Sequence, residues 1–115
     1  MSNKQLSTVA TVLIKARNLL SDIDNWCPEV EGVNGERRLP NGRVQRCAIR
    51  AVSYMSEGLD DDPYLEYHDR VSAKAIHALS QAAFPNSVIN VNAQGHAAVM
   101  ALYDKAITKA IANVL

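Results

Sequence analysis

The chain has 115 residues, a length that suits one domain and leaves no room for a second. Its composition, 48% hydrophobic and only 5% aromatic, favours alanine-rich packed helices over a β-sandwich. Twelve basic and twelve acidic residues cancel, which argues against a general nucleic-acid binder and against an acidic DNA mimic.

The first predicted element is a helix from about Asn3 to Asp22. Ser2 and Gln5 match a capping box at its start, and apolar residues recur at helical spacing along it. Polar residues interrupt this stretch, so it resembles neither a signal peptide nor the roughly eighteen apolar residues of a membrane span. We therefore expect a cytoplasmic protein that does not enter a membrane.

A long loop from Asp24 to Gly42 follows, and loops of this length in compact domains are often functional. It contains two Asn-Gly pairs, which suit turns with positive φ. The pair Asn34-Gly35 predicts a small hairpin between residues 29–33 and residues 36–39. We expect Trp26 to anchor the loop to the core, and a ligand platform is the alternative.

The second helix is predicted from about Val44 to Glu57, with Gly58 ending it. Its polar residues fall on one narrow stripe, so we expect this helix to be central and buried. The third helix is predicted to begin with Asp62 as its N-cap and Pro63 as its first residue, and to end near Ala83. Its expected inner face comprises Tyr64, Tyr67, His68, Val71, Ala75, Ala78, Leu79 and Ala82.

The stretch 86–95 alternates asparagines with β-branched residues and predicts a short extended piece or a buried loop. The last helix is predicted from Ala93 or His96 to Asn113, with Asn92 as its candidate cap. Together these elements predict an all-α fold. It is a compact bundle of about four helices in a single domain that spans residues 1–115.

The two cysteines, Cys27 and Cys47, are expected to be reduced thiols, with a disulfide between them as the alternative. Cys47 lies where the second helix is predicted to begin. In thiol hydrolases a nucleophilic cysteine opens a buried helix, since the helix N-terminus lowers a thiol pKa, and His96 would then be the base. However, the helical rhythm after His96 leaves no strand to carry that base. We therefore favour packing for Cys47 over catalysis.

His96 could also bind an anion or a metal, although a solvent-facing residue of a first helical turn is the favoured interpretation. The three histidines lie on different helices or faces, and neither a metal-ligand spacing nor a phosphate-binding loop occurs. The sequence therefore predicts no metal and no cofactor.

One local concentration of charge stands out, a basic cluster that runs from the long loop into the second helix. Such a cluster suits phosphate, nucleic acid or an acidic partner, whereas a solvated face that nearby glutamates neutralise is the favoured interpretation. The candidate binding residues are Trp26, Arg37, Arg38, Arg43, Arg46 and Arg50.

A Trp-containing loop precedes a Gly-rich turn, a Cys followed by an alanine-rich helix, and a final V-x-x-L-x-D-x-A-I motif. These features comprise Trp26, Gly35, Cys47, Ala51, Val99, Leu102, Asp104, Ala106 and Ile107. In this order they resemble the pattern of the bacterial and phage family DUF6197. The resemblance implies a shared fold, and it implies no particular chemistry.

These patterns favour a small non-enzymatic binding or regulatory protein, encoded by a phage or mobile element, with a protein partner. Alanine-rich helices often leave an apolar face for a second copy, so a homodimer is expected. Two alternatives stay open. One is a cysteine-dependent hydrolase that uses Cys47 and His96, and the other is a protein that sequesters a small anionic ligand with Arg43, Arg46 and His96.

Overall fold

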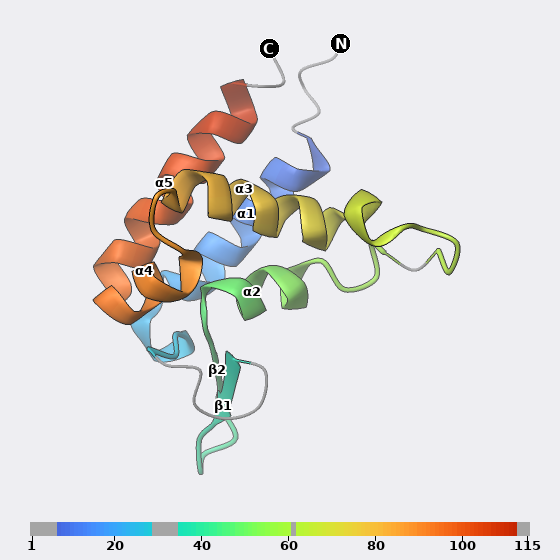
Figure 1. Ribbon diagram of the computed structural model, residues 1–115. Coiled ribbons are helices and arrows are strands. Elements are labelled where there is room, and N and C mark those ends of the chain that lie inside the picture. Colours follow the sequence, from blue (N-terminus) through green and yellow to red (C-terminus); the bar gives the residue numbers. More distant parts are fainter. Residues whose placement is uncertain (1–6, 29–34, 61, 113–115) are drawn as a thin grey trace.

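The computed structural model describes residues 7–28, 35–60 and 62–112, which are mostly helical (Figure 1). The α-helices of these ranges are α1 (Thr8–Leu20), α2 (Ala48–Met55), α3 (Val71–Ala83), α4 (Val88–Gln94) and α5 (His96–Ala112). Two strands, β1 (Glu36–Arg38) and β2 (Val44–Arg46), form an antiparallel hairpin, and η1 (Ile23–Asn25) and η3 (Tyr67–Asp69) are single 3-10 turns. The predicted helical character is confirmed, but five α-helices are present in the described ranges instead of about four.

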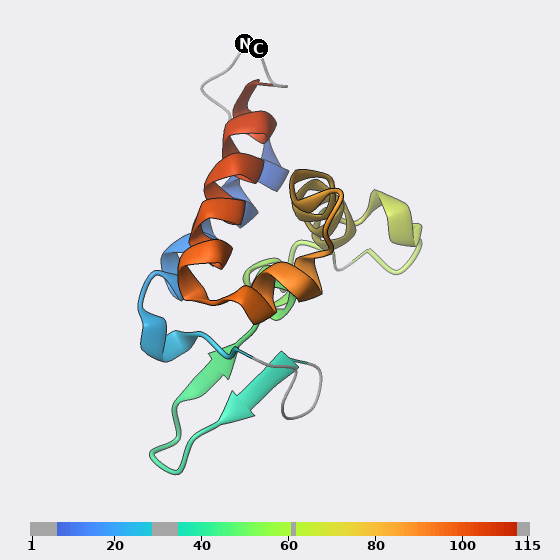
Figure 2. The ribbon, with the colours of Figure 1, turned by 60° about the vertical axis from the view of Figure 1, so that its left-hand side comes forward.

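The core lies between three long helices and the shorter α2. α1 and α5 run antiparallel, and α3 crosses beside both of them (Figures 1 and 2). α2 packs against α1, and α4 packs against α5. Most of the largest fully buried side chains come from α1, α2, α3 and α5, and they include Leu13, Leu20, Val52, Leu79, Val99 and Tyr103. Burial of these apolar side chains supplies the main driving force for the fold.

The first helix starts later than predicted. α1 begins at Thr8, and the Ser7 hydroxyl caps it by accepting a 3.0 Å hydrogen bond from the Ala10 N–H. The expected capping box at Ser2 and Gln5 lies outside the described residues. No helix within the described ranges is both long enough and apolar enough to cross a lipid bilayer.

The predicted start of the second helix was wrong, because residues 44–46 form strand β2. This strand pairs with β1 in a register that sets Glu36 opposite Arg46, and the carboxylate of Glu36 bonds the guanidinium of Arg46. The hairpin turns at the second Asn-Gly pair, where Gly42 has a φ of +88°. Residues 29–33, the predicted partner strand, lie outside the described residues. α2 therefore begins only at Ala48.

The predicted start of the third helix was also wrong, because α3 begins at Val71 after the N-cap residue Arg70, and Asp60 instead of Asp62 supplies the carboxylate at its start. The Asp60 carboxylate accepts hydrogen bonds from the Val71 and Ser72 N–H groups at 2.7 and 3.2 Å. Asp62 instead accepts a 2.9 Å bond from the N–H of Tyr64 in a local turn. Thirteen residues of α3 follow Arg70, and the side chains of Tyr64, Tyr67 and His68, expected on an inner face, are exposed.

The stretch around residue 90 is helical and not extended. Ser87 caps α4 with a 3.1 Å bond from the Asn90 N–H, and Gly95, with a φ of +128°, separates α4 from α5. Asn92, expected as a helix cap, is instead a buried residue within α4. Val88 and Val91 are buried beside it, so core packing overrides the β propensity of these residues.

Candidate functional site

Asn92 is buried on α4 and uses its whole amide group. Its Oδ1 accepts hydrogen bonds from the Trp26 indole N–H at 2.9 Å and from the Ala48 N–H at 3.0 Å. Its Nδ2 donates to the carbonyls of Cys27 and Pro28 at 3.1 and 3.0 Å. One side chain thereby fixes the segment after η1 to the first residue of α2.

The first residue of α2 is held from a second side as well. The Tyr103 hydroxyl of α5 donates a 2.5 Å hydrogen bond to the Ala48 carbonyl. Burial raises the pKa of Tyr103 far above its ordinary value, so the hydroxyl remains a neutral donor. Both backbone polar groups of Ala48 are therefore bound by side chains from the C-terminal half of the chain.

Cys47 directly precedes this residue and acts as the N-cap of α2. Its Sγ accepts a 3.4 Å hydrogen bond from the Arg50 N–H, and its side chain is buried. Gly35 packs against it so closely that an added Cβ would lie 2.5 Å from the sulfur. Cys47 also lines a small, mainly apolar pocket of about 160 Å³, together with Pro28 and Ile89. This environment is that of a packed thiol.

His96 is the first residue of α5, and its side chain contacts the end of α1 and Trp26. Its Nε2 lies 2.6 Å from the Leu20 carbonyl oxygen. A carbonyl oxygen only accepts, so Nε2 carries the proton and donates. The ring also meets Trp26 edge to face, with the ring centroids 5.6 Å apart. The histidine thus fixes the end of α1 and one side of the indole.

The structure does not join the two residues expected to form a Cys–His pair. Within the described residues no hydrogen bond links the Cys47 thiol to the imidazole of His96. His96 and Cys47 are connected indirectly: His96 contacts Trp26, Trp26 bonds Asn92, and Asn92 bonds Ala48, the residue after Cys47. Trp26 is the loop anchor that the sequence predicts, being buried and bonded at both its ring and its nitrogen.

Most of the basic cluster makes bonds within the hairpin and its surroundings. Arg46 and Arg50 both bond the Glu36 carboxylate, at 3.2 and 3.0 Å, and Arg46 also lies over the Tyr54 ring at 3.6 Å. Hydrogen bonding from Arg50 is the main cause that lowers the pKa of Glu36, and the charges of both arginines add to it against the opposing effect of burial.

The other arginines of the cluster lie along the same hairpin. Arg43 forms a 2.8 Å ion pair with Asp22 and a 3.1 Å hydrogen bond to the Asn25 side chain. Arg37 donates to Gln45 at 2.8 Å. Arg38 is exposed on β1. Four of the five arginines thus bond neighbouring side chains, and three of them, Arg43, Arg46 and Arg50, pair with a carboxylate.

The connection between α2 and α3 exposes large apolar and aromatic side chains to solvent. We call residues 57–60 and 62–70 the tyrosine loop. Tyr64 and Tyr67 are 91% and 70% exposed there, and Leu59 is 50% exposed. The tyrosine loop projects from the helical body beyond the N-terminal end of α3 (Figures 1 and 2). Sequence analysis missed this surface because it placed both tyrosines on a helix.

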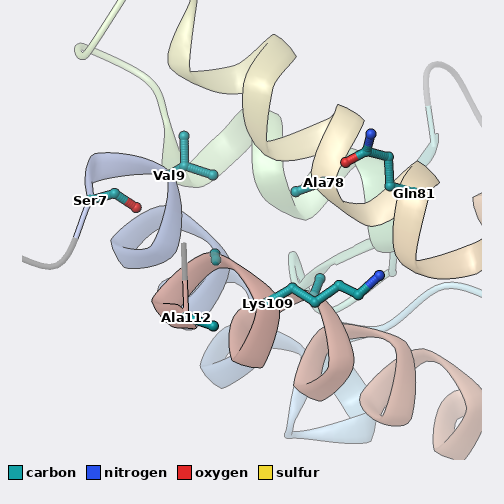
Figure 3. Close-up of a pocket in the computed structure, with 8 residues that line it drawn as sticks. Ser7, Val9, Ala78, Gln81, Lys109 and Ala112 are labelled. Atoms are coloured by element: carbon teal, nitrogen blue, oxygen red, sulfur yellow. The ribbon is translucent and has the colours of Figure 1, made fainter. Parts of the chain in front are cut away.

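A groove of about 450 Å³ lies at the far end of the molecule, between the start of α1 and the ends of α3 and α5 (Figure 3). Alanines line much of it, since their small side chains leave the space between the helices unfilled. Gln81 and Lys109 are its polar side chains from α3 and α5, and both are exposed. The described lining of the groove is therefore open and mainly apolar, and no set of polar groups converges within it.

Two residues that organise the molecule were not identified as functional candidates from the sequence. Asp60 was not singled out, and Asn92 was expected only as a helix cap. Asn92 leaves a recognisable signal, because it lies four residues after Val88 and therefore on the buried face of α4. No group of three or more metal-ligating side chains is gathered in the described ranges.

Comparison with known proteins gives one match. No curated protein and no solved structure matches the chain. The sequence does match the family described as a family of unknown function, DUF6197, over residues 4–109. This match includes Trp26, Asn92, the hairpin and the tyrosine loop. Since it covers most of the chain, the protein belongs to the DUF6197 family.

Proposed function

We propose that the protein is a non-enzymatic binding module that presents the tyrosine loop to a protein partner. The observation that carries the proposal is the exposure of Tyr64 and Tyr67, at 91% and 70%. Tyrosine supplies a large contact area with a polar tip at a low cost in side-chain entropy, and it is enriched among the residues that dominate binding energy at interfaces.

The tyrosine loop also has the order that a preformed interface needs. Its N-terminal part is fixed by the bonds from Val71 and Ser72 to Asp60. Three internal backbone bonds follow: the Leu65 N–H donates to the Asp62 carbonyl at 3.1 Å, the Asp69 N–H to the Glu66 carbonyl at 3.0 Å, and the Arg70 N–H to the Tyr67 carbonyl at 3.1 Å. A loop held in this way loses less conformational entropy on binding than an unstructured one.

A non-enzymatic role is supported by the structural bonds of the thiol and the imidazole that the hydrolase alternative requires. The Cys47 thiol caps α2, and the His96 imidazole bonds a backbone carbonyl. A thiol hydrolase needs these two groups within hydrogen-bonding reach of one another. Their separate structural bonds favour a binding role over the hydrolase alternative.

The test is affinity capture with matched variants. Immobilised wild-type protein, the double variant Tyr64→Ala/Tyr67→Ala and the control Ile89→Ala are exposed to lysate of the native host, and captured proteins are repurified to measure direct binding. Ile89 is 59% exposed on α4, so its truncation removes a similar apolar surface elsewhere. We expect a partner that binds the wild type and the control and is lost from the double variant. Equal capture by all three proteins would refute the proposal.

A further inference from the structure

The tyrosine loop carries a large share of the negative charge of a chain whose net charge is zero. It contains five acidic residues and one arginine, whereas the rest of the chain contains seven acidic and eleven basic residues. The tyrosine loop therefore has a formal charge of −4 and the remainder +4. Such a separation creates a local negative potential at the projecting end of the molecule.

Most of the acidic side chains described there face solvent. Asp60 is used internally, because its oxygens accept bonds from the start of α3, but Glu57, Asp62, Glu66 and Asp69 are exposed. Asp62 is fixed next to Tyr64 by its bond to the N–H of that residue. Carboxylates and aromatic rings are thus presented on the same short segment.

We infer that the tyrosine loop binds a Lys- and Arg-rich segment of another protein. This inference rests on the proposed function and names the chemistry of the partner. Ammonium and guanidinium groups bind carboxylates through charge-assisted hydrogen bonds and lie over tyrosine rings through cation–π contacts. The same charge repels the phosphates of nucleic acids and of anionic membranes.

A second copy of this chain is a poorer occupant than a separate protein. Its arginines are largely engaged within the chain, where Arg17 bonds Asp104, Arg43 bonds Asp22, and Arg46 bonds Glu36. The exposed lysines are spread over three helices, at Lys15, Lys74, Lys105 and Lys109. The basic cluster of the hairpin is therefore held mainly by carboxylates of its own chain, which makes it a poorer match for the tyrosine loop than the unpaired Lys and Arg side chains of a separate protein.

The experiment selects binders from a displayed random-peptide library. Peptides are enriched on the wild-type protein and depleted on Tyr64→Ala/Tyr67→Ala, and their Kd values are then measured. A second variant, Glu57→Gln/Asp62→Asn/Glu66→Gln/Asp69→Asn, removes four exposed charges and keeps both tyrosines and Asp60. We expect loop-dependent peptides rich in Lys and Arg. Their Kd should rise about tenfold or more in the neutralised variant, and it should rise with salt.

The other outcomes distinguish a failure of the basic partner from a failure of the binding module itself. Loop-dependent peptides without net positive charge, or with equal Kd in the neutralised variant, would overturn the basic partner and leave the binding module intact. Failure to enrich any loop-dependent peptide would contradict the binding module itself. Sedimentation equilibrium of the wild type is the remaining check. Self-association that the neutralised variant abolishes would assign the tyrosine loop to a second copy and overturn the inference of a separate protein.

Discussion

Among individual residues, Asn92 connects parts of the chain that are far apart in sequence. Its side chain bonds the indole of Trp26, two carbonyls that follow it, and the first N–H of α2. Truncation would remove all four of these bonds, and a buried polar group that loses its hydrogen bond costs about 1–3 kcal/mol. An apolar replacement of similar size would remove the same bonds.

We predict that Asn92→Ala lowers the free energy of unfolding by about 3 kcal/mol or more. The control is Asn90→Ala, the same substitution two residues away at an exposed position of α4. Because alanine has the higher helix propensity, the control should be neutral or slightly stabilising. Urea unfolding of both variants decides the matter. Equal stability of the two would show that the amide of Asn92 contributes little.

Cys47 gives the second prediction at this scale. Its burial and its contact with Gly35 predict that the thiol resists iodoacetamide in the native protein and reacts after denaturation. The measurement uses a Cys27→Ala background, so that one thiol reports. His96→Ala should leave the native rate unchanged, since the imidazole bonds Leu20. Fast native alkylation that depends on His96 would restore the hydrolase alternative.

At the scale of elements, the start of α3 depends on a residue eleven positions before it. Asp60 accepts bonds from the Val71 and Ser72 N–H groups, while Asp62 serves only a local turn. We predict that Asp60→Ala destabilises the protein by about 1–2 kcal/mol, as the loss of a helix cap does. The matched control Asp62→Ala should cost less. Thermal or urea unfolding distinguishes them, and the opposite order would support the helix start that the sequence suggests.

The carboxylates of Glu36 in the hairpin and Asp60 at the start of α3 determine how stability is expected to respond to acid. Paired arginines lower the pKa of Glu36 below its ordinary value of 4.5, and hydrogen bonds from Val71 and Ser72 lower that of Asp60 below 3.8, despite the opposing effect of partial burial. A lowered folded-state pKa contributes stability that is present above the unfolded pKa and is lost as pH falls through the folded one. We therefore expect stability to fall as the pH drops below about 4.5.

Glu36→Gln tests this acid dependence. The variant should be less stable than the wild type at pH 7, and the gap between the two should close as the pH falls below 4. Glu66→Gln is the control, since Glu66 is exposed. Urea unfolding between pH 3 and 7 gives the comparison. A gap that stays constant with pH would contradict the role of the ionised carboxylate.

The element boundaries show which information the sequence lacks. Asp62 followed by Pro63 is an excellent local start for a helix, yet a carboxylate two residues earlier wins because it reaches two N–H groups of α3. Likewise, residues 44–46 fit a helical pattern, but pairing with β1 and the ion pair with Glu36 hold them in a strand. Local patterns predicted the presence of helices, and tertiary bonds decided where each begins.

At the scale of the whole molecule, the proposed binding surface is separate from the core. Tyr64 and Tyr67 are exposed and lie outside the buried cluster. We predict that Tyr64→Ala/Tyr67→Ala changes the free energy of unfolding by no more than about 0.5 kcal/mol per site, as surface substitutions do. Tyr103→Phe, which removes a buried hydroxyl, should cost more. Calorimetry of the three proteins checks this, and a large loss in the double variant would mean that the tyrosines support the fold.

For the candidate site, too, the local sequence predicted individual residues but not their tertiary partners. Trp26 was recognisable from the sequence as an anchor, because a single large aromatic side chain in a long loop usually packs into the core. The arginines were recognisable as a cluster, but their partners were not, since Glu36 and Asp22 reach them only through the hairpin. The tyrosine loop could not be found while residues 62–70 were taken as helix.

The bonds of Asn92 also bear on the order of events during synthesis. The amide lies 64 to 66 positions after the groups that it holds at residues 26–28. The ribosome synthesises the chain from its N-terminus, so α1, the hairpin and α2 emerge before Asn92, the residue that joins them. The indole N–H of Trp26 and the first N–H of α2 must wait for α4. A nascent chain halted before residue 92 should therefore remain sensitive to protease around residues 26–28, and protection should appear once α4 has cleared the exit tunnel.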